Sequence, residues 1–294
     1  MQNQNKFHYK AMMFLSFAGP AVILFSAVVI VPFLFGLYLT FTGWDGISSS
    51  IPFVGLENYV ALFQDGSFWV SLGRTILYAF VAVILANVVA FGLAYLVTSK
   101  IKGSNFFRAA FFTPNLIGGI VLGYIWQFVF KKAILVIGDA TGFSLFSTSW
   151  LSDPIKAFWA LIIVTVWQLS GYLMLIYIAG LMGVSDDLKE AAKIDGCDEK
   201  KTTRYITLPM MAGTFTICFF LAITRAFVTY DVNISLTEGG PYGSTTLAAM
   251  YVYNMAFSSK KYGLGQAEAL ILFLVIAIIA VTQAFIGKSK EVEA

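Results

Sequence analysis

Charged side chains are scarce in this chain. Only 12% of its 294 residues are Asp, Glu, Lys or Arg, whereas 59% are hydrophobic. Soluble domains contain roughly 25% charged residues, so this composition excludes an ordinary water-soluble protein and indicates a membrane protein. The net charge is only +3 and no basic run is interleaved with aromatic residues, so we expect no nucleic-acid partner.

Histidine and cysteine are also nearly absent. The one histidine, His8, lies in the N-terminal tail, so the sequence offers neither a Ser-His-Asp triad nor a histidine-based metal site. We therefore expect no enzyme activity and no bound metal. The two cysteines, Cys197 and Cys218, fall in a predicted cytosolic loop and in a predicted span, so no disulfide is expected.

A phosphate-binding loop is missing as well. The tripeptide "GKS" at Gly287 to Ser289 would need a glycine five places before Gly287, but that position is Thr282. The tripeptide also follows an apolar segment and not a strand. We therefore expect no nucleotide or other cofactor on this chain.

Long uncharged segments, in contrast, are abundant. A helix needs about 20 apolar residues to cross the hydrocarbon layer of a membrane, and the apolar residues here do not alternate with polar ones as barrel strands require. We predict an all-α membrane protein that forms a single transmembrane domain over residues 1–294. Its six predicted helices lie at about 12–40, 72–99, 107–130, 157–182, 205–230 and 267–287.

The distribution of Lys and Arg predicts the orientation, because these residues are enriched in short cytosolic loops. With the N-terminus inside, twelve cations lie on the cytosolic side: Lys6, Lys10, Lys100, Lys102, Arg108, Lys189, Lys193, Lys200, Lys201, Arg204, Lys288 and Lys290. Six lie on the other side: Arg74, Lys131, Lys132, Lys156, Lys260 and Lys261. We therefore predict that both chain ends are cytosolic.

One polar segment, "DDLKEAAKIDGCDEKKTTRYITLP" from Asp186 to Pro209, separates the fourth and fifth predicted spans. Ser185 is a suitable N-cap, acids are favoured in the first helical turn, and Gly196 is a suitable stop. The pattern predicts a short helix followed by another turn or two before Pro209. A polar helical loop is also an ordinary connection between spans, so composition alone assigns this segment no function.

The spacing within this segment resembles the EAA motif of permease subunits in binding-protein-dependent ATP-binding-cassette importers. The pattern is Glu190-Ala191-Ala192, three residues, Gly196, nine residues, Ile206, one residue, and Leu208-Pro209. The stretches "FVGLENYVALFQDGSFWVSLGRT", "FFRAAFFTPNLIGGIVLGYIWQFVF" and "LTEGGPYGSTTLAAMYVYNMAF" resemble the carbohydrate branch, which includes maltose and oligosaccharide permeases. Two residues depart from the family pattern: Arg74 replaces an expected Asn, and Glu268 stands where small residues are usual.

The resemblance implies a permease subunit in a bacterial plasma membrane. Its coupling loop, residues 185–206, would dock as a coupling helix on a cytosolic ATPase dimer that uses ATP and Mg. The coupling residues would be Glu190, Ala191, Ala192, Gly196, Ile206, Leu208 and Pro209. The other implied partners are a second, similar permease subunit and an extracellular solute-binding protein that delivers a sugar or oligosaccharide.

A transport path needs polar and aromatic side chains that face the bundle interior. The candidates are Asn87, Asn115, Trp126, Gln127, Trp167, Gln168, Tyr172, Arg225, Tyr230, Asp231 and Asn233. Trp and Tyr near span ends also serve as interfacial anchors, and Asn or Gln in a membrane also joins helices. Arg225 either lines a cavity or extends to the lipid headgroups.

Two other functional classes remain open. A self-sufficient secondary transporter or channel for a small polar solute would need ion-coupling acids in its spans or two related halves, and only Arg225 with nearby Asp231 hints at this. An EAA loop has no purpose in such a protein. A membrane enzyme is a third class, for which the sequence has no catalytic set.

Overall fold

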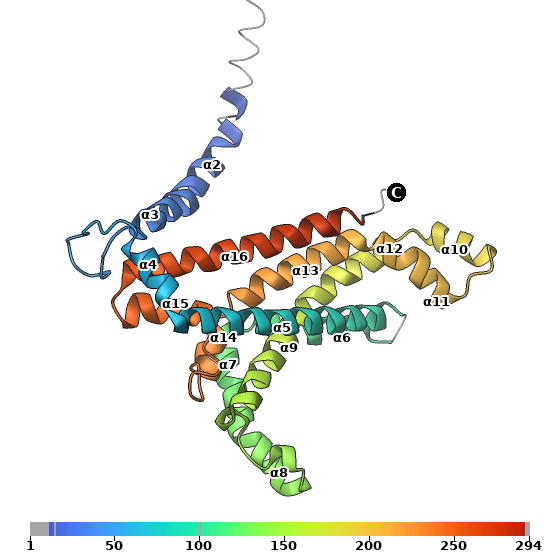
Figure 1. Cartoon of the computed structure of the whole chain (residues 1–294). Coiled ribbons are helices and arrows are strands. Elements are labelled where there is room, and N and C mark those ends of the chain that lie inside the picture. Colours follow the sequence, from blue (N-terminus) through green and yellow to red (C-terminus); the bar gives the residue numbers. More distant parts are fainter. Residues whose placement is uncertain (1–11, 15, 100–101, 292–294) are drawn as a thin grey trace, which may run out of the picture. The chain divides into compact units, whose positions relative to one another are not determined.

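The computed structural model describes residues 12–14, 16–99 and 102–291. Within these ranges the chain forms helices joined by loops and turns, without a β-strand, as Figure 1 shows. The all-α prediction is therefore confirmed for the described residues. Lys6, His8, Lys10 and Lys100, for which the sequence predicts a cytosolic or tail position, lie outside the described residues.

The helices follow one another in this order along the chain. The α-helices are α2 Gly19–Phe25, α3 Val31–Leu39, α4 Glu57–Gln64, α5 Gly66–Thr98, α6 Ser104–Leu116, α7 Gly119–Phe128, α8 Ile134–Thr141, α9 Pro154–Gly183, α10 Asp186–Ile194, α11 Glu199–Thr202, α12 Leu208–Met210, α13 Ala212–Phe227, α14 Asp231–Leu236, α15 Ala248–Tyr253 and α16 Tyr262–Lys288. Short π-helical stretches, η1 Ser26–Ile30, η2 Val129–Ala133, η5 Thr203–Thr207 and η6 Asn254–Ser258, continue neighbouring helices, and η3 Ser144–Phe146 and η4 Trp150–Ser152 are 3₁₀ turns.

Five stretches of the described chain are helical, long and apolar enough to cross a membrane: Gly19–Leu39, Gly66–Thr98, Gly119–Thr141, Pro154–Gly183 and Tyr262–Lys288. A sixth is obtained if Glu199–Met210 and Ala212–Phe227, which are bent by 64° at Met211, are taken as one span. Multiple apolar helices of this length agree with a multi-pass membrane protein. The count of six spans stays a prediction.

The structure differs from the sequence prediction at the third span. The predicted range 107–130 is divided between α6 and α7, because the chain is extended at Ile117 and at Gly118. Pro114 lies in the last turn of α6, and a proline removes a backbone donor from the helix. The long helical stretch suited to a membrane instead begins at Gly119 and continues to Thr141.

Two compact units are distinguished by their internal contacts, and each is described by itself. Unit 1 consists of residues 1–65 and 252–270. Within it, the Asn58 amide donates hydrogen bonds of 2.8 Å to the carbonyl oxygens of Thr40 and Thr42. In its exposed loop, hydrogen bonds from the backbone of Ser48 and then Ile47 hold the pKa of Asp45 below its usual value.

Unit 2 consists of residues 66–251 and 271–294, and its core lies where α5, α9 and α13 pack against one another. Helix α6 packs on α9, and α7 packs on α14. Small residues permit the closest approaches: a Cβ on Gly171 of α9 would overlap the carbonyl of Phe111 in α6, and a Cβ on Gly123 of α7 would overlap the side chain of Ser235 in α14. Close backbone approach at small residues is how helices associate in membranes.

Candidate functional site

The EAA segment begins with a well-capped helix. The Ser185 hydroxyl accepts a hydrogen bond of 3.2 Å from the backbone N–H of Asp187, as the sequence predicted. Asp186 and Asp187 lie in the first turn of α10 and Lys193 lies in the last, which favours the helix dipole. The Lys189 ammonium also forms an ion pair of 3.0 Å with Asp186. These local interactions explain why so polar a segment is helical.

Gly196 ends this helix, as predicted. Its φ of +83° lies in the left-handed region, where glycine has no steric penalty. The backbone N–H of Cys197 donates to the Ala192 carbonyl at 2.9 Å, and that of Gly196 donates to the Lys193 carbonyl at 3.0 Å. This pair of bonds is the Schellman motif. The Asp198 carboxylate then caps α11 by accepting from the Lys201 N–H at 2.7 Å.

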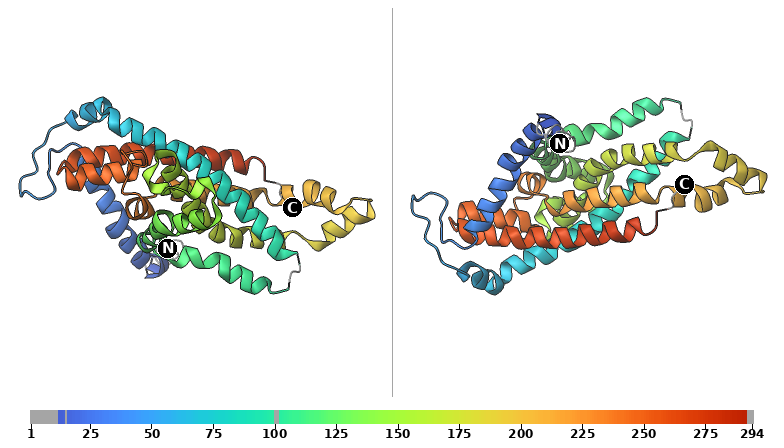
Figure 2. Two further views of the ribbon diagram at one scale, coloured as in Figure 1. Left: turned by 90° about the horizontal axis from the view of Figure 1, so that it is seen from below. Right: turned by 90° about the horizontal axis from the view of Figure 1, so that it is seen from above.

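The EAA residues are exposed or half-buried, with the exception of Ala192. Glu190, Ala191 and Gly196 are exposed, whereas Ala192 is only 7% exposed. Ile206 lies in η5, and Leu208 and Pro209 form the start of α12, which leads into α13. Because α10 packs against both α11 and η5, the exposed face of α10 is connected through packed elements to a long bundle helix. Figure 2 shows α10 and α11, in yellow and orange, extending beyond the end of the bundle of unit 2.

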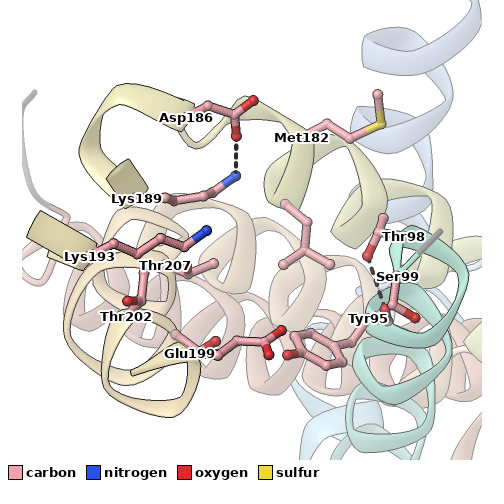
Figure 3. A pocket seen from close by; sticks show the side chains of 12 residues that line it. Tyr95, Thr98, Ser99, Met182, Asp186, Lys189, Lys193, Glu199, Thr202 and Thr207 are labelled. Atoms are coloured by element: carbon pink, nitrogen blue, oxygen red, sulfur yellow. Dashed lines mark hydrogen bonds and ion pairs between the residues drawn. The ribbon is translucent and has the colours of Figure 1, made fainter. Parts of the chain in front are cut away.

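A cavity of about 660 Å³ lies next to α10, and Figure 3 shows its lining residues. It is lined by residues at the ends of α5 and α9 together with residues of α10, α11 and η5: Tyr95, Thr98, Ser99, Leu181, Met182, Asp186, Lys189, Lys193, Glu199, Thr202, Thr203 and Thr207. The lining is largely polar and contains both acids and bases. The cavity thus lies between the EAA helix and the ends of α5 and α9.

Three of the predicted path residues meet around Arg225. Its guanidinium donates a hydrogen bond of 2.9 Å to the amide oxygen of Asn115, and its Cζ lies 4.3 Å from the centre of the Tyr172 ring. The three residues come from α13, α6 and α9. A cation over an aromatic face is attracted by the ring quadrupole. Arg225 is itself exposed and lines a cavity with other candidates, and its role in a transport path stays a prediction.

That cavity has a volume of about 450 Å³ and contains four of the predicted path residues. Its lining consists of Gly119, Thr165, Gln168, Leu169, Arg225, Val228, Thr229, Tyr230, Asp231 and Val232. The Gln168 amide donates to the Ile117 carbonyl at 3.2 Å, across the break between α6 and α7. A cavity with several amide, hydroxyl and charged groups suits a hydroxyl-rich ligand.

The remaining aromatic candidates form a separate cluster. The Trp126 ring lies 5.3 Å from that of Trp167, edge to face, and 5.3 Å from that of Phe130, stacked. The indole nitrogen of Trp126 is buried and has no hydrogen-bond partner in the described part of the chain. Gln127 donates to the carbonyls of Ser235 and Leu236 at 3.2 and 3.3 Å, and so joins α7 to α14.

Two of the path candidates, Asn87 and Asn233, are buried and form hydrogen bonds within the protein. Asn87 is 4% exposed, accepts a hydrogen bond of 2.7 Å from the Tyr177 hydroxyl and donates one of 2.8 Å to the Val83 carbonyl. Asn233 is fully buried and donates to the Thr245 carbonyl at 2.8 Å, which holds the loop after α14. In both cases the polar group joins segments of the protein, which is the alternative weighed for membrane amides. Their role in a path stays a prediction.

The structure also identifies residues that were not among the candidates. Thr165 and Thr229 line the same cavity as Arg225, and the Tyr78 hydroxyl lies 2.6 Å from that of Thr165. Threonine is common in apolar helices, so no sequence signal marked them. Arg74, which departs from the family pattern, donates to the carbonyls of Gly243 and Thr246 at 2.7 and 3.1 Å and holds the "TEGGPYGSTT" loop.

Comparisons with known proteins agree on one class. The family described as binding-protein-dependent transport system inner membrane component matches residues 86–291. A probable starch degradation products transport system permease protein of Thermoanaerobacterium thermosulfurigenes is 40% identical over 100% of both chains. A multiple sugar-binding transport system permease protein of Streptococcus mutans is 35% identical over 89% of this chain and 90% of that protein.

A solved structure shares the fold. It is that of a bacterial ABC transporter involved in the import of the acidic polysaccharide alginate, with a TM-score of 0.82, 16% identity, and coverage of 98% of this chain and 99% of that chain. At this identity the likeness shows the fold alone.

Proposed function

Because the chain belongs to the family of binding-protein-dependent transport system inner membrane components, we propose that it is the permease subunit of an ATP-driven sugar importer. Two relatives that match nearly the whole chain are named for starch degradation products and for multiple sugars. The cargo that these names favour is a sugar or a short oligosaccharide. A cavity lined by Gln168, Arg225 and Tyr230 offers hydrogen-bonding groups to the hydroxyls of such a solute.

The observation that carries this proposal is the EAA pattern on a capped helix outside the bundle. Glu190 and Ala191 are exposed on α10, and Gly196 ends that helix with defined geometry. We infer that this exposed face docks on a cytosolic ATPase, where Glu190 pairs with a basic group and the alanines permit close approach. ATP and Mg bind to the ATPase and not to this chain.

Motion would pass from the ATPase to the membrane through packed elements. Helix α10 contacts η5, and η5 continues through α12 into α13, which carries Arg225. A displacement of α10 would therefore reach the cavity around Arg225 along one continuous segment. The 64° bend at Met211 lies between the two ends of that segment.

The same assignment implies an assembly. We propose six spans with both chain ends cytosolic, counting the bent pair as one span, and a second permease subunit that completes the path. An extracellular solute-binding protein would deliver the sugar, and one solved relative of this fold is described in complex with a pentasaccharide-bound periplasmic protein. The host membrane would be a bacterial plasma membrane.

The test uses the complete importer, reconstituted with its ATPase, second permease and binding protein. We expect Glu190→Lys or Gly196→Pro to leave assembly in the membrane intact, because both residues are exposed. Sugar uptake should fall at least about tenfold. Glu190→Lys removes a charge-assisted contact to the docked partner, which contributes roughly 1.5–3 kcal/mol. Gly196→Pro removes the left-handed turn and the N–H bond that end α10. Uptake and ATP hydrolysis are measured together, so that loss of coupling is seen directly.

Asp139→Lys is the matched control, because Asp139 is also an exposed acid and lies on α8, far along the chain from the EAA segment. It should transport like the unmodified protein. Normal uptake by Glu190→Lys would argue against docking through α10. Accumulation of a solute by this chain alone in liposomes would instead favour a self-sufficient transporter.

A further inference from the structure

Unit 2 also contains a groove whose walls are mainly apolar, unlike those of the two cavities described above. It has a volume of about 900 Å³ and lies between the α12–α13 segment and the C-terminal half of α16. Its deep walls are apolar and include Phe215 and Phe219 on one side and Ile278 and Ile279 on the other. The path proposed above does not use it.

The groove exists because α13 and α16 meet through small and polar groups. Gly287 lies directly against the Thr216 side chain, and the Gln283 amide donates to the Thr216 carbonyl at 3.3 Å. The larger side chains beside these contacts remain uncovered, since Ile278 is 65% and Ile286 is 55% exposed. The amide oxygen of Gln283 is buried without a hydrogen-bond partner in the described part of the chain.

One end of the groove is cationic. Arg204 and Lys290 line it at the cytosolic ends of the two walls, and both side chains are exposed. Glu291 lies at the same end beside Gly213 but does not line the groove. The groove is therefore apolar along most of its length and positively charged at the end nearest α10.

We propose that this groove binds one anionic phospholipid of the cytosolic leaflet. An acyl chain fits between the phenylalanines and isoleucines, and the phosphate lies between Arg204 and Lys290. Basic pockets between transmembrane helices on the cytosolic side recognise anionic headgroups in this way. A helix of another subunit would also fill the apolar part, but it would need an acidic side chain level with Arg204 and Lys290, whereas the phosphate of an anionic lipid supplies this charge itself. This proposal rests on the proposed function in one respect: the groove end with Arg204 and Lys290 must face the cytosol. It does not depend on docking of the ATPase.

A lipid in the groove would restrict the motion of η5, α12 and α13, the segment through which we propose that α10 acts on the membrane helices. Arg204, in η5, and Phe215, in α13, belong to the stretch that follows α10, whereas Lys290 follows α16. A lipid held by both walls links them. Its binding would thus favour one arrangement of α12–α13 relative to α16.

The experiment is native mass spectrometry of the full chain in detergent, titrated with phosphatidylglycerol or with phosphatidylcholine of the same acyl chains. We expect one phosphatidylglycerol to be retained in preference to phosphatidylcholine. The double variant Arg204→Ala/Lys290→Ala should weaken phosphatidylglycerol binding about thirtyfold, given roughly 1 kcal/mol per basic residue. Ile279→Trp, which fills the apolar part, should weaken the binding of both lipids.

Two matched controls separate this site from general attraction. Lys200→Ala/Lys201→Ala removes the same charge from exposed cations of α11 that do not line the groove, and Val281→Trp adds the same bulk to an exposed position of α16. Both should bind phosphatidylglycerol normally. Near-ultraviolet circular dichroism shows whether each variant remains folded.

Four results would overturn the proposal. Equal loss of binding in the Lys200/Lys201 control would mean unspecific attraction to the charged surface. Retention of phosphatidylglycerol by folded Ile279→Trp, or equal binding of glycerol phosphate without acyl chains, would mean a headgroup site only. Loss of the lipid on assembly with the second permease would mean that the groove is the subunit interface. None of these results would affect the coupling test with Glu190→Lys.

Discussion

At the scale of single residues, the same residue type has different roles in different places. Asn87 and Asn115 are both amides in apolar helices, yet Asn87 is buried against Tyr177 whereas Asn115 accepts from Arg225 beside a cavity. The sequence names both as path candidates because an amide in a membrane serves either purpose. Only the neighbours on other helices distinguish them.

Tyr177→Phe tests the packing role of Asn87. The variant leaves the buried amide oxygen without its 2.7 Å hydrogen bond, which should lower the free energy of unfolding by about 1 kcal/mol. The midpoint of denaturant unfolding in micelles should fall while the KM of uptake stays unchanged. Tyr124→Phe, at a side chain that is 57% exposed, should change neither. A raised KM with unchanged stability would place Asn87 in the path.

Arg225→Lys tests the cavity cluster. Lysine keeps the charge but loses the planar group that lies 4.3 Å from the Tyr172 ring centre and donates to Asn115. We expect the KM of uptake to rise several-fold, and about tenfold for Arg225→Ala, since a hydrogen bond from a charged group to a solute hydroxyl contributes at least roughly 1.5 kcal/mol. Arg108→Lys, on α6 like Asn115, serves as the control. An unchanged KM in Arg225→Ala would mean that Arg225 does not contact the solute.

At the scale of elements, capping residues in the sequence determine where α10 begins and ends, whereas the break between α6 and α7 and the bend at Met211 are not determined by nearby residues. Helix α10 has its cap, its first-turn acids and its glycine stop within one short segment, so its bounds follow from sequence. The break between α6 and α7 does not, because Pro114 is compatible with a kinked but continuous helix. The bend at Met211 likewise follows Pro209 without being required by it.

Gly171→Ala tests the packing of α6 on α9. The added methyl group would overlap the backbone carbonyl of Phe111, which cannot move without shifting the helix. We expect the free energy of unfolding to fall by about 1–3 kcal/mol or more, because overpacking displaces backbone. Gly92→Ala is the control, since a Cβ there meets open space. Equal stability of the two variants in micelles would contradict the packing described for α6 and α9.

At the scale of the whole molecule, the uneven distribution of Lys and Arg remains the basis of the predicted topology. The described helices supply five apolar stretches of sufficient length and one bent pair. An odd number of spans would place the two chain ends on opposite sides, whereas six place them on the same side. Counting the bent pair as one span therefore decides where the C-terminus lies.

Cysteine labelling tests that topology. In a Cys197→Ser background, Lys260→Cys should react in intact cells with a membrane-impermeant maleimide, because Lys260 is exposed between η6 and α16, outside the apolar stretches and on the predicted outer side. Lys200→Cys, which is exposed in α11, should react only after permeabilisation. The parent protein with Cys197→Ser retains only Cys218, which is buried, and its labelling gives the background level. The reverse pattern would invert the orientation and remove the basis for ATPase docking through α10.

The sequence by itself determined the features that depend on neighbouring residues along the chain. These are the all-α membrane class, the approximate positions of four of the six predicted spans, the capped helix before Gly196 and the EAA spacing. Hydropathy, capping and left-handed glycine are local effects, so they can be derived without knowing the fold.

Only the tertiary structure decided which distant residues meet. It brought Arg225, Asn115 and Tyr172 together from three helices, buried Asn87 and Asn233 in hydrogen bonds within the protein, and left a groove between α13 and α16. Such contacts depend on how helices rotate and cross, and in a nearly uniform apolar chain no periodic pattern specifies that rotation. Close approach at a few small residues, Gly123, Gly171 and Gly287, does so instead.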